Sequence, residues 1–431
     1  MILAGGFGTR LSKVYHDIPK PLLPVGKQPL IEYQINQCKT YGFKKILILV
    51  HHKANQIIDF LGDGKKYNLE FEFVREDVPL GTGGAMINSL HLMNENFLVI
   101  YGDTFFKIDL NFFYEFHLKH RADSTVFLHP NDHPYDSDLV KIDKNDYVEK
   151  IFSYPHKESL LTRNLVNAAM YFFNKKKLNY VKLKRKKFDI AKDFLPKMLQ
   201  NKMKIKGYVS QEYIKDAGTP DRIIKVNNHI KNNLHNKLSL AGLRKAVFID
   251  RDGTINKEVD HLNDLSKFKL IENSAKGISL LNQNGYLAIV ITNQPVIARG
   301  ELSFEGLDNI HSKMEKVLSY NNAYVDKIYF CPHHPDSGFD GEVKELKINC
   351  NCRKPKTELF EKSIKDLKID VKSSWMIGDR TSDILAGKRS SLNTILVKTG
   401  YFGSDNKYDV KPDFIMDDLY SAIKFIIEND N

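Results

Sequence analysis

Residues 246–254 read Ala-Val-Phe-Ile-Asp-Arg-Asp-Gly-Thr, an apolar run that ends on two carboxylates. The four apolar residues predict a buried strand with Asp250 and Asp252 at its carboxyl end. Two later apolar runs also end on polar residues, at Leu287–Asn293 and at Ser374–Asp379. Because parallel strands bring their carboxyl ends to one edge of a sheet, the pattern predicts an α/β fold with polar side chains gathered at that edge.

Asp250 and Asp252 have the spacing that covalent phosphate hydrolysis requires. One carboxylate can attack phosphorus to give an aspartyl-phosphate, and the other can protonate the leaving oxygen and then activate water. Mg²⁺ would offset the charge between carboxylates and phosphate, and Lys354 can neutralise charge during transfer. Asp-x-Asp alone is as typical of a turn or a helix cap, so the catalytic interpretation depends on the later strand ends.

The first half of the chain also alternates apolar runs with helical patterns. We therefore expect two Rossmann-like three-layer α/β domains, at residues 1–235 and 245–431, with a linker at 236–244 that is part of an Asn-, Lys- and His-rich segment. The expected strands of the first domain are Lys45–Val50, Glu70–Val74, Phe97–Tyr101 and Ser124–Leu128, with helices such as Pro29–Tyr41 between them.

A glycine-rich loop follows the first short apolar run. Gly5, Gly6 and Gly8 allow the backbone to approach phosphate oxygens and to direct N–H groups at them. Arg10 can neutralise charge as pyrophosphate leaves, and Lys20 lies in a proline-rich loop that would hold it stiffly. A lone glycine loop is as typical of an ordinary turn.

Further residues make a nucleotide site the better interpretation of this loop. Gly81 and Thr82 belong to a second glycine loop, at Leu80–Gly84. Asp103 follows an expected strand, and Asp216 precedes a turn. Two carboxylates can hold Mg²⁺ between the nucleotide and a sugar phosphate.

Three of the four cysteines cluster with a histidine at residues 331–352. Cys331 and His333 are separated by 16 residues from Cys350 and Cys352. Three thiolates and an imidazole suit tetrahedral Zn²⁺, and a disulfide framework is not expected in a large protein without a secretion signal. His334 is the rival ligand, and four unliganded residues are the remaining alternative.

Composition narrows the classes of partner. The formal net charge of +11 reflects lysines that are scattered along the chain, with the densest group at Lys182–Lys187. Basic residues do not alternate with aromatic ones, as they do on surfaces that bind nucleic acid. Apolar runs are strand-sized and no signal peptide is evident, so we expect a cytoplasmic protein without membrane or nucleic-acid partners. The oligomeric state is not specified by the sequence.

The first half resembles the sugar-1-phosphate nucleotidyltransferases. The resemblance lies in Leu3–Leu11, Pro19–Gly26, Pro79–Ala85, Tyr101–Thr104, Val148–Lys150, Asn167–Tyr171 and Asp216–Pro220. It implies that Gly5, Gly6, Gly8, Arg10 and Lys20 bind the triphosphate, that Gly81 and Thr82 lie near the base, that Asp103 and Asp216 bind Mg²⁺, and that Glu149, Lys150 and Asn167 hold the sugar phosphate. The Leu80–Ala85 and Gly102–Phe106 segments are most similar to guanylyltransferases for heptose 1-phosphate.

The chain departs from that family at three places. Its first strand is short, Ala191 stands where the family often has glutamate, and Asn167-Ala168-Ala169 stands where a glycine is common at the third position. These departures concern the first strand and the sugar contacts and leave the phosphate and metal positions intact.

The second half resembles the haloacid-dehalogenase phosphatases. Asp250, Asp252, Thr292, Asn293, Lys354 and Asp379 occur in the family's order, and the Cys/His spacing is similar to the group that holds heptose 1,7-bisphosphate 7-phosphatases and histidinol phosphatases. The resemblance implies Asp250 as nucleophile and Asp252 as acid/base. It also implies Thr292, Asn293, Arg353, Lys354 and Arg380 as phosphate or sugar contacts. Mg²⁺ would be bound by Asp250, Asp379 and the backbone carbonyl of Asp252, and structural Zn²⁺ by the Cys/His cluster.

Together the two resemblances imply a bifunctional enzyme of nucleotide-heptose synthesis. The second domain would remove the 7-phosphate of D-glycero-D-manno-heptose 1,7-bisphosphate, and the first would join heptose 1-phosphate to GTP, giving GDP-heptose and pyrophosphate. One alternative pairs another sugar nucleotidyltransferase with a histidinol-phosphatase-like domain. Another is a first domain that binds nucleotide without turnover, which Ala191 and the short first strand would favour.

Overall fold

The structure, a computed structural model, describes residues 1–7, 11, 15, 17–181, 183, 186–338 and 340–430. Its residues form two compact units. The first unit comprises Met1–His129, Asp136–His156 and Leu165–Ser239, and the second comprises Pro130–Tyr135, Lys157–Asn164 and Leu240–Asn431. Two short segments from the first half of the sequence therefore belong to the second unit.

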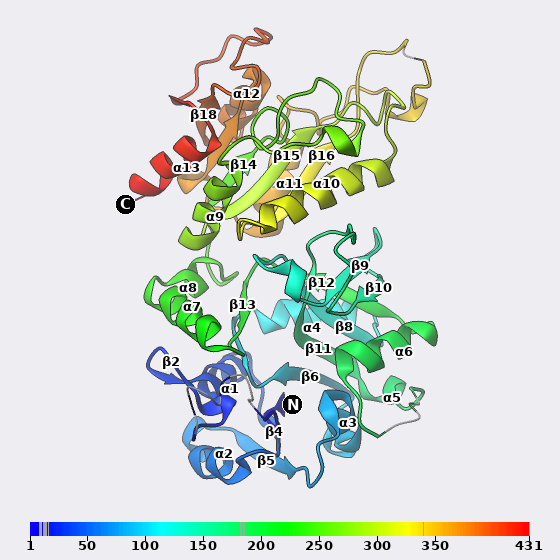
Figure 1. Ribbon diagram of the computed structural model, residues 1–431, viewed down its shortest axis with the longest axis vertical. Coiled ribbons are helices and arrows are strands. Elements are labelled where there is room, and N and C mark those ends of the chain that lie inside the picture. Colours follow the sequence, from blue (N-terminus) through cyan, green and yellow to red (C-terminus); the bar gives the residue numbers. More distant parts are fainter. Residues whose placement is uncertain are drawn as a thin grey trace. The chain divides into compact units, whose positions relative to one another are not determined.

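The second unit is built on a six-stranded sheet in which every pair of neighbouring strands is parallel (Figure 1). The strand order is β16-β15-β14-β17-β18-β19. The strands are β14 (Ala246–Ile249), β15 (Leu287–Asn293), β16 (Lys327–Cys331), β17 (Trp375–Gly378), β18 (Asn393–Val397) and β19 (Phe414–Met416). The helices are α9 (Ser274–Asn284), α10 (Phe304–Ser319), α11 (Glu358–Leu367), α12 (Thr381–Arg389) and α13 (Leu419–Glu428).

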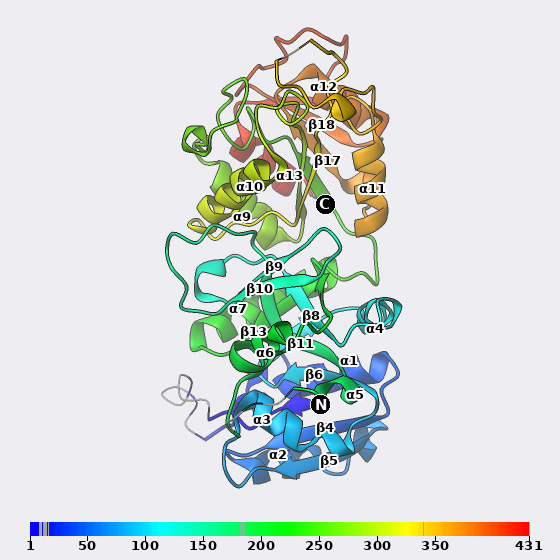
Figure 2. The ribbon, with the colours of Figure 1, turned by 90° about the vertical axis from the view of Figure 1, so that its right-hand side faces the viewer.

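Strand β14 is buried along its whole length because helices cover both faces of the sheet (Figure 2). Val247 and Ile249 pack in a core with residues of α9, α10 and α13. Phe248 faces the other way and meets Phe360 of α11 at a ring-centroid distance of 5.3 Å. Each fully buried side chain of this size contributes about 1.5–3 kcal/mol to folding. The central strand is thereby fixed, and its carboxyl end is the start of the Asp250 loop.

The first unit contains a nine-stranded mixed sheet. Its main path is β10-β9-β11-β6-β1-β4-β5, with β8 beside β11 and β12 beside β8. The strands are β1 (Ile2–Leu3), β4 (Lys45–Val50), β5 (Glu70–Arg75), β6 (Asn96–Tyr101), β8 (Ser124–His129), β9 (Leu139–Ile142), β10 (Val148–Phe152), β11 (Val166–Asn174) and β12 (Ile205–Val209). Strands β1, β4, β5 and β6 are parallel, so their carboxyl ends share one edge.

Besides short 3₁₀ helices and a π-helix at Ile190–Phe194, the described part of the first unit contains two short strand pairs and eight α-helices. The pairs are β2 (Pro24–Val25) with β3 (Gln28–Pro29), and β7 (Thr104–Lys107) with β13 (Tyr213–Asp216). The helices are α1 (Leu30–Thr40), α2 (Ala54–Leu61), α3 (Gly81–Asn88), α4 (Leu110–Lys119), α5 (Lys175–Leu178), α6 (Leu195–Gln200), α7 (Pro220–Lys231) and α8 (Leu234–Lys237). The pairing of β7 with β13 places Asp216 opposite Thr104 and therefore close to Asp103.

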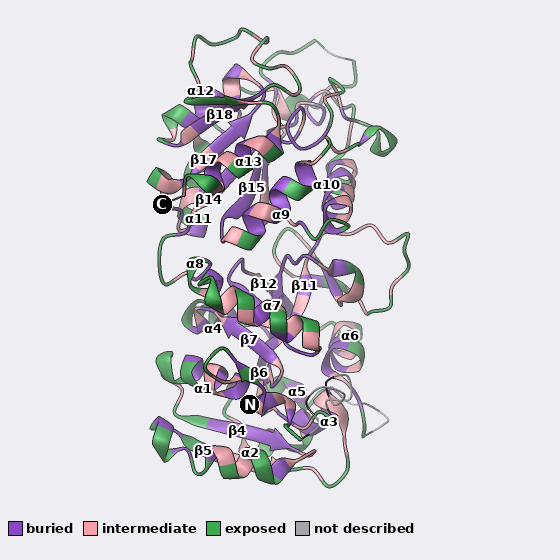
Figure 3. Cartoon of the chain, turned by 60° about the vertical axis from the view of Figure 1, so that its left-hand side comes forward, coloured by how far each residue is buried: buried purple, intermediate pink, exposed green. Residues whose placement is uncertain are grey.

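The expected fold class is confirmed in both units. The strands expected from the sequence are present with ends shifted by at most one residue, as in β6, which begins at Asn96 rather than Phe97. Buried strands and half-buried helices alternate along the chain, as the three-layer arrangement requires (Figure 3). Within the described residues, no helix combines the length and the apolar character needed to cross a membrane.

Candidate functional site

Three buried carboxylates meet at the carboxyl edge of the second unit's sheet. Asp250 follows β14, Asp379 follows β17, and Asp383 lies in the first turn of α12. One carboxylate oxygen of each lies within 4.8 Å of the others. Oxygen donors crowded in this way are suited to a hard divalent cation such as Mg²⁺.

Lys354 joins two of these carboxylates. Its Nζ lies 2.8 Å from Asp250 Oδ1 and 2.7 Å from Asp383 Oδ1, and it donates to the carbonyl oxygen of Ile291 at 2.7 Å. Burial alone would lower the pKa of Lys354, but the two carboxylates outweigh it and hold the pKa above its usual value. The ammonium group therefore stays charged beside Asp250. The backbone amide of Lys354 donates to Asn293 Oδ1 at 3.0 Å, which fixes the loop.

Asp379 is the member of the cluster that most needs a cation. Its Oδ1 is buried and has no hydrogen-bond partner among the described residues, whereas Oδ2 accepts from the amide of Tyr401 at 2.8 Å. Burial and the charges of Asp383 and Asp250 raise the pKa of Asp379 to about 8. A divalent cation would offset this repulsion. By contrast, Asp383 uses Oδ1 for Lys354 and Oδ2 for the amide of Arg380, so its main role is to position Lys354.

Two glycines enclose the Asp379 carboxylate. Gly253 and Gly400 have φ angles of +80° and +60°, which side chains rarely adopt. A Cβ at Gly253 would lie 2.4 Å from Asp379 Oδ2, and one at Gly400 would lie 2.2 Å from the same atom. The backbone thus closes around the carboxylate, and neither position has room for a side chain.

The side chain of Asp252 does not join the three-carboxylate cluster. Its Oδ2 accepts from Arg251 at 2.8 Å and from Gln294 Nε2 at 2.7 Å, and its Oδ1 accepts from Asn256 at 2.9 Å. Burial would raise the pKa of Asp252, but Arg251 and these hydrogen bonds outweigh it and hold the pKa below its usual value. Asp252 is therefore ionised, and both of its carboxylate oxygens accept from these donors.

The pocket in front of these carboxylates has a volume of about 240 Å³ and a polar lining. The residues expected to contact phosphate or sugar (Thr292, Asn293, Arg353 and Arg380) all line it. Arg353 is half-buried, and burial lowers its pKa. It donates to the carbonyl oxygen of His333 at 3.4 Å and forms no ion pair with any described residue. A half-buried cation without a carboxylate partner favours an anionic ligand.

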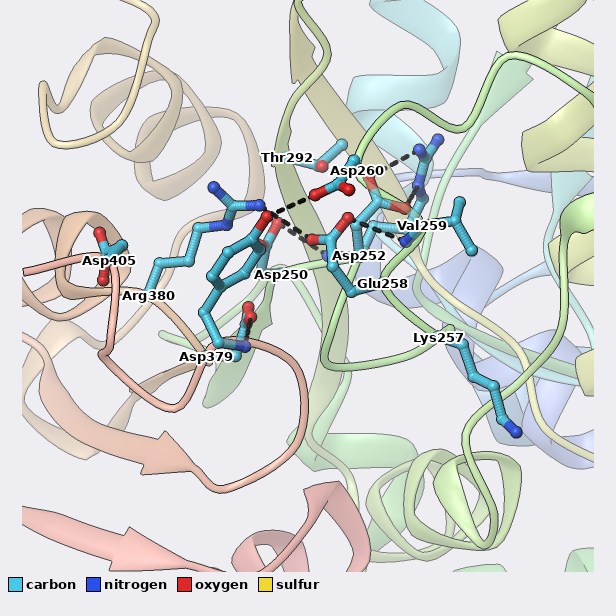
Figure 4. A network of polar contacts seen from close by, with 12 residues as sticks. Asp250, Asp252, Lys257, Glu258, Val259, Asp260, Thr292, Asp379, Arg380 and Asp405 are labelled. Atoms are coloured by element: carbon cyan, nitrogen blue, oxygen red, sulfur yellow. Dashed lines mark hydrogen bonds and ion pairs between the residues drawn. The ribbon is translucent and has the colours of Figure 1, made fainter.

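Arg380 is held from two sides, by Glu258, which is labelled near it in Figure 4, and by Tyr401. Its Nη2 lies 2.9 Å from Glu258 Oε2, and the centre of its guanidinium group lies 3.9 Å from the centroid of the Tyr401 ring. The Tyr401 hydroxyl donates to Asp260 Oδ1 at 2.7 Å. The amide of Tyr401 meets Asp379, as described above, so one residue braces both Arg380 and the carboxylate.

The Cys/His cluster expected from the sequence is brought together in the second unit. Sγ of Cys331 lies 3.5 Å from that of Cys350 and 3.1 Å from that of Cys352, and His333 Nδ1 lies 3.2 Å from Cys352 Sγ. Four soft donors at these separations fit a tetrahedral Zn²⁺ ion. The rival, His334, lies outside the cluster and accepts at Nδ1 from the amide of Asp336 at 3.1 Å.

A cleft of about 360 Å³ lies at the carboxyl edge of the first unit's sheet. Of the residues expected to bind nucleotide, Gly5, Gly6, Lys20, Gly81, Thr82 and Asp103 line it. Gly8 and Arg10 lie outside the described residues. Lys20 Nζ is 3.2 Å from Asp103 Oδ2, and both side chains are partly exposed to the cleft.

Asp216 lies near both Asp103 and Lys20, around Gly218. A Cβ at Gly218 would lie 3.0 Å from Asp216 Oδ2 and 3.8 Å from both Asp103 Oδ2 and Lys20 Nζ, so the three groups surround one glycine. The amide of Ala217 donates to the carbonyl oxygen of Asp103 at 2.7 Å. Asp216 also pairs with Arg222 at 2.6 Å. Two carboxylates and an ammonium group can bind a cation and a phosphate side by side.

The second glycine loop is shaped by its own backbone contacts. Gly81 has φ +72°, and a Cβ there would lie 2.5 Å from the carbonyl oxygen of Phe188. The Thr82 hydroxyl donates to Asp189 Oδ2 at 2.7 Å and accepts from the amide of Ile190 at 2.9 Å. Thr82 therefore fixes the loop rather than offering its hydroxyl to a ligand.

The expected sugar-phosphate residues of the first unit do not line the described cleft. Glu149 pairs with Lys141 at 3.1 Å, and Lys150 Nζ lies 5.0 Å from the Phe152 ring centroid. Asn167 Oδ1 accepts from the amide of Ala169 at 3.1 Å. Ala169 has φ +55°, so alanine occupies a left-handed position at which glycine is favoured. Sugar contacts by these three residues stay a prediction.

The comparisons with known proteins follow the division of the chain. The family profile described as nucleotidyl transferase matches residues 1–233, and one described as HAD-hydrolase-like matches residues 351–422. The D-glycero-beta-D-manno-heptose-1,7-bisphosphate 7-phosphatase of Haemophilus ducreyi is 36% identical over 185 residues, which cover 42% of this chain and 98% of that protein.

The chain belongs to the nucleotidyl transferase family through its first half and to the heptose-1,7-bisphosphate 7-phosphatases through its second half. It is an enzyme with a transferase half and a phosphatase half. A D-glycero-alpha-D-manno-heptose-1,7-bisphosphate 7-phosphatase from Photorhabdus laumondii is 39% identical over 168 residues, 39% of this chain and 86% of that protein. The first half is also similar to HddC from Yersinia pseudotuberculosis, whose crystal structure is known. The sequences are 31% identical, the TM-score is 0.46, and the match covers 53% of this chain and 97% of HddC.

Sequence reasoning missed two site residues that strand order could have found. Tyr401 lies beyond the carboxyl end of β18 and lines the phosphatase pocket. Glu76 directly follows β5 and lines the transferase cleft. Both lie at the sheet edge that the other site residues define, but neither belongs to a recognisable motif.

The fit of the backbone around Asp379 predicts the effect of Gly400→Ala. The added methyl group would displace the Asp379 carboxylate, and a misplacement of about 1 Å can cost roughly 100-fold in rate. We expect phosphatase kcat to fall by at least about tenfold and the Mg²⁺ concentration for half-maximal rate to rise. Gly403→Ala is the control, because Gly403 also has a left-handed φ, +68°, but its Cβ would meet Leu396 at 3.3 Å and Thr381 at 3.9 Å rather than the Asp379 carboxylate. Equal loss in both variants would contradict the assignment of Asp379.

The Cys/His cluster predicts a metal-dependent loop. Cys352→Ser should reduce the bound zinc, measured by plasma mass spectrometry, from one ion per chain and should lower the melting temperature of the phosphatase half. Cys38→Ser serves as the control, because Cys38 is a buried cysteine of the first unit outside the cluster. A full zinc content in Cys352→Ser would show that the cluster is not the metal site.

Proposed function

We propose that this chain carries out two consecutive steps of nucleotide-heptose synthesis. The phosphatase half hydrolyses the 7-phosphate of D-glycero-D-manno-heptose 1,7-bisphosphate. The transferase half then joins heptose 1-phosphate to GTP and releases GDP-heptose and pyrophosphate. The carrying observation is that a phosphatase whose relatives act on a heptose bisphosphate shares a chain with a nucleotidyl transferase. The product of the first reaction is the substrate of the second.

The phosphatase step is assigned to the residues at the carboxyl end of β14. Asp250 attacks phosphorus and forms an aspartyl-phosphate, with Lys354 neutralising charge at 2.8 Å from Oδ1. Asp252 gives a proton to the leaving sugar oxygen and then takes one from the water that hydrolyses the intermediate. Mg²⁺ fits the Asp250–Asp379 cluster, with the unpartnered Oδ1 of Asp379 as a ligand, and would supply charge neutralisation there.

The second phosphate of a bisphosphate substrate has a binding partner in Arg353. This guanidinium lines the pocket without an ion pair among the described residues, and its neighbour Lys354 already serves the reacting phosphate. Arg353 follows Cys352 directly and donates to the carbonyl oxygen of His333, so two members of the Cys/His cluster flank it. A structural Zn²⁺ in that cluster would fix the loop that presents both cations.

The transferase step requires positioning and charge neutralisation rather than a covalent intermediate. The sugar phosphate attacks the α-phosphorus in line, and the glycine loop beginning at Gly5 holds the departing phosphates through backbone N–H groups. Lys20 binds phosphate, and Asp103 and Asp216 would hold Mg²⁺. We assign Arg10, by resemblance, to the triphosphate. All substrates are small molecules, and we propose that the enzyme acts in the cytoplasm.

Glu76 supports the choice of guanine. Its carboxylate lies in the transferase cleft, with Oε1 accepting from the amide of Leu80 at 3.2 Å. Its Oε2 has no donor among the described residues and lies beside the Gly5 backbone. Guanine presents two adjacent donors, N1–H and N2–H, whereas adenine, uracil and thymine do not. Burial raises the pKa of Glu76, so a ligand that donates to the carboxylate would offset its desolvation.

A pair of variants tests the two activities separately. Asp250→Asn should abolish phosphate release from heptose 1,7-bisphosphate but leave GDP-heptose formation from heptose 1-phosphate intact. Asp103→Ala should do the reverse, with a loss of at least about 100-fold in pyrophosphate release. Products are measured by mass spectrometry with both anomers of the bisphosphate and all common nucleoside triphosphates. Histidinol phosphate is the competing phosphatase substrate, and hydrolysis of it alone would overturn the heptose assignment.

Glu76→Gln tests whether Glu76 recognises the base of the nucleotide. The NH₂ group of glutamine would face an N–H donor of guanine where the wild type offers an acceptor oxygen. An unpaired polar contact of this kind costs about 1–3 kcal/mol. We expect kcat/KM for GTP to fall roughly tenfold to 100-fold and kcat/KM for ATP to be unchanged or higher. Asp77→Asn, at the next residue, is the matched control. An unchanged preference for GTP in Glu76→Gln would exclude Glu76 as the determinant.

A further inference from the structure

A second cavity in the first unit carries an excess of positive charge. It has a volume of about 520 Å³ and lies near the start of β6, β8 and β12. Because β6 ends at Tyr101, just before Asp103, the cavity is at the opposite edge of the sheet from the transferase cleft. Four cations line it, Arg121, Lys177, Lys202 and Lys204, against one carboxylate, that of Asp123.

None of these four cations forms an ion pair with any described residue. Asp123 can offset only one of the four positive charges, and its Oδ2 accepts from the backbone amide of Lys204 at 2.8 Å. Like charges gathered around one cavity repel each other, and an anionic ligand would remove that repulsion.

Two of the cations occupy backbone positions that disfavour side chains. Arg121 has φ +45° and Lys202 has φ +55°, both in the left-handed region. They lie just beyond the ends of α4 and α6, at places where glycine is usual. Retaining a long cationic side chain at both positions costs stability, and strain of this kind is typical of functional sites.

The floor of the cavity is polar, uncharged and fixed. His117 is buried, with Nδ1 2.8 Å from Thr125 Oγ1 and Nε2 3.2 Å from Asn96 Oδ1. Asn174 Nδ2 donates to the same Asn96 oxygen at 3.2 Å. Burial lowers the pKa of His117 to about 4, so the ring stays neutral. Leu118 adds an apolar wall, against which a flat ring can pack.

We propose that this cavity binds a nucleoside diphosphate or its sugar ester. The cations match a diphosphate group, the apolar wall and amide-bearing floor match a base or sugar, and the volume lies in the range of small-molecule sites. The site is separate from both active sites and requires neither to be correctly assigned.

The test is the number of GDP molecules that the full-length protein binds, measured by equilibrium dialysis with radiolabelled GDP. Arg121→Gly/Lys202→Gly removes two cations and relieves the left-handed backbone, so the melting temperature should not fall. We expect this variant to bind one GDP fewer per chain than the wild type. Lys53→Gly is the control, because Lys53 also has a left-handed φ, +54°, and does not line this cavity. Equal stoichiometry in the wild type and the double variant would overturn the proposal.

A second variant covers the case in which the double glycine variant folds poorly. Lys177→Ser/Lys204→Ser changes two cations at positions with ordinary backbone and should weaken the same GDP site at least tenfold. Unlabelled GDP-mannose then identifies the source: its competition at this site indicates a sugar nucleotide, and competition by GDP alone indicates the free nucleotide. Unchanged affinity in the serine variant would contradict the site.

Discussion

The buried ammonium group of Lys354 is the interaction on which the phosphatase pocket depends. It contacts Asp250 after β14, Asp383 in α12 and the carbonyl oxygen of Ile291 in β15, and so ties together three elements of the sheet edge. Without it, three buried carboxylates would face each other uncompensated. Removing one partner of a buried charge pair costs about 3–5 kcal/mol, so the position of Lys354 is a condition for the pocket as well as for its chemistry.

The transferase cleft is organised by a looser contact of the same kind. Lys20 and Asp103 are partly exposed, at 21% and 29% of their side-chain surfaces, and their pairing is open to substrate. Solvent-exposed pairs contribute little to stability. This cleft therefore derives its shape from backbone contacts, such as those at Gly81 and Gly102, whereas the phosphatase pocket combines such contacts at Gly253 and Gly400 with buried charge.

Those parts of the molecule that depend on local pattern could be predicted from the sequence. Strands such as β6 and β14 are largely apolar runs because helices cover both faces of a sheet, and their carboxyl ends gave the positions of Asp103 and Asp250. The Cys/His spacing identified four residues that the structure brings within 4.8 Å of one another.

The remaining features depend on contacts between distant residues. The sequence does not show that Asp252 turns toward Arg251 and Gln294, or that Tyr401 braces Arg380. It also does not show that Glu149 pairs with Lys141, or that residues 157–164 belong to the second unit. Each of these outcomes is decided by which partner lies nearest in space, and spacing along the chain carries no information about that.

The hydrogen bonds around Asp252 have a consequence for when the phosphatase is active. Arg251, Asn256 and Gln294 donate to this carboxylate and hold its pKa below the usual value, so Asp252 needs a rise in pKa before it can act as the proposed acid. A bound phosphate places new negative charge nearby, and like charge favours the protonated form of a carboxyl group. The substrate thus supplies the condition under which its own leaving group can be protonated. An ester without a charged phosphoryl group would leave Asp252 ionised, so in the proposed mechanism the pocket selects for phosphate esters before a sugar hydroxyl is recognised.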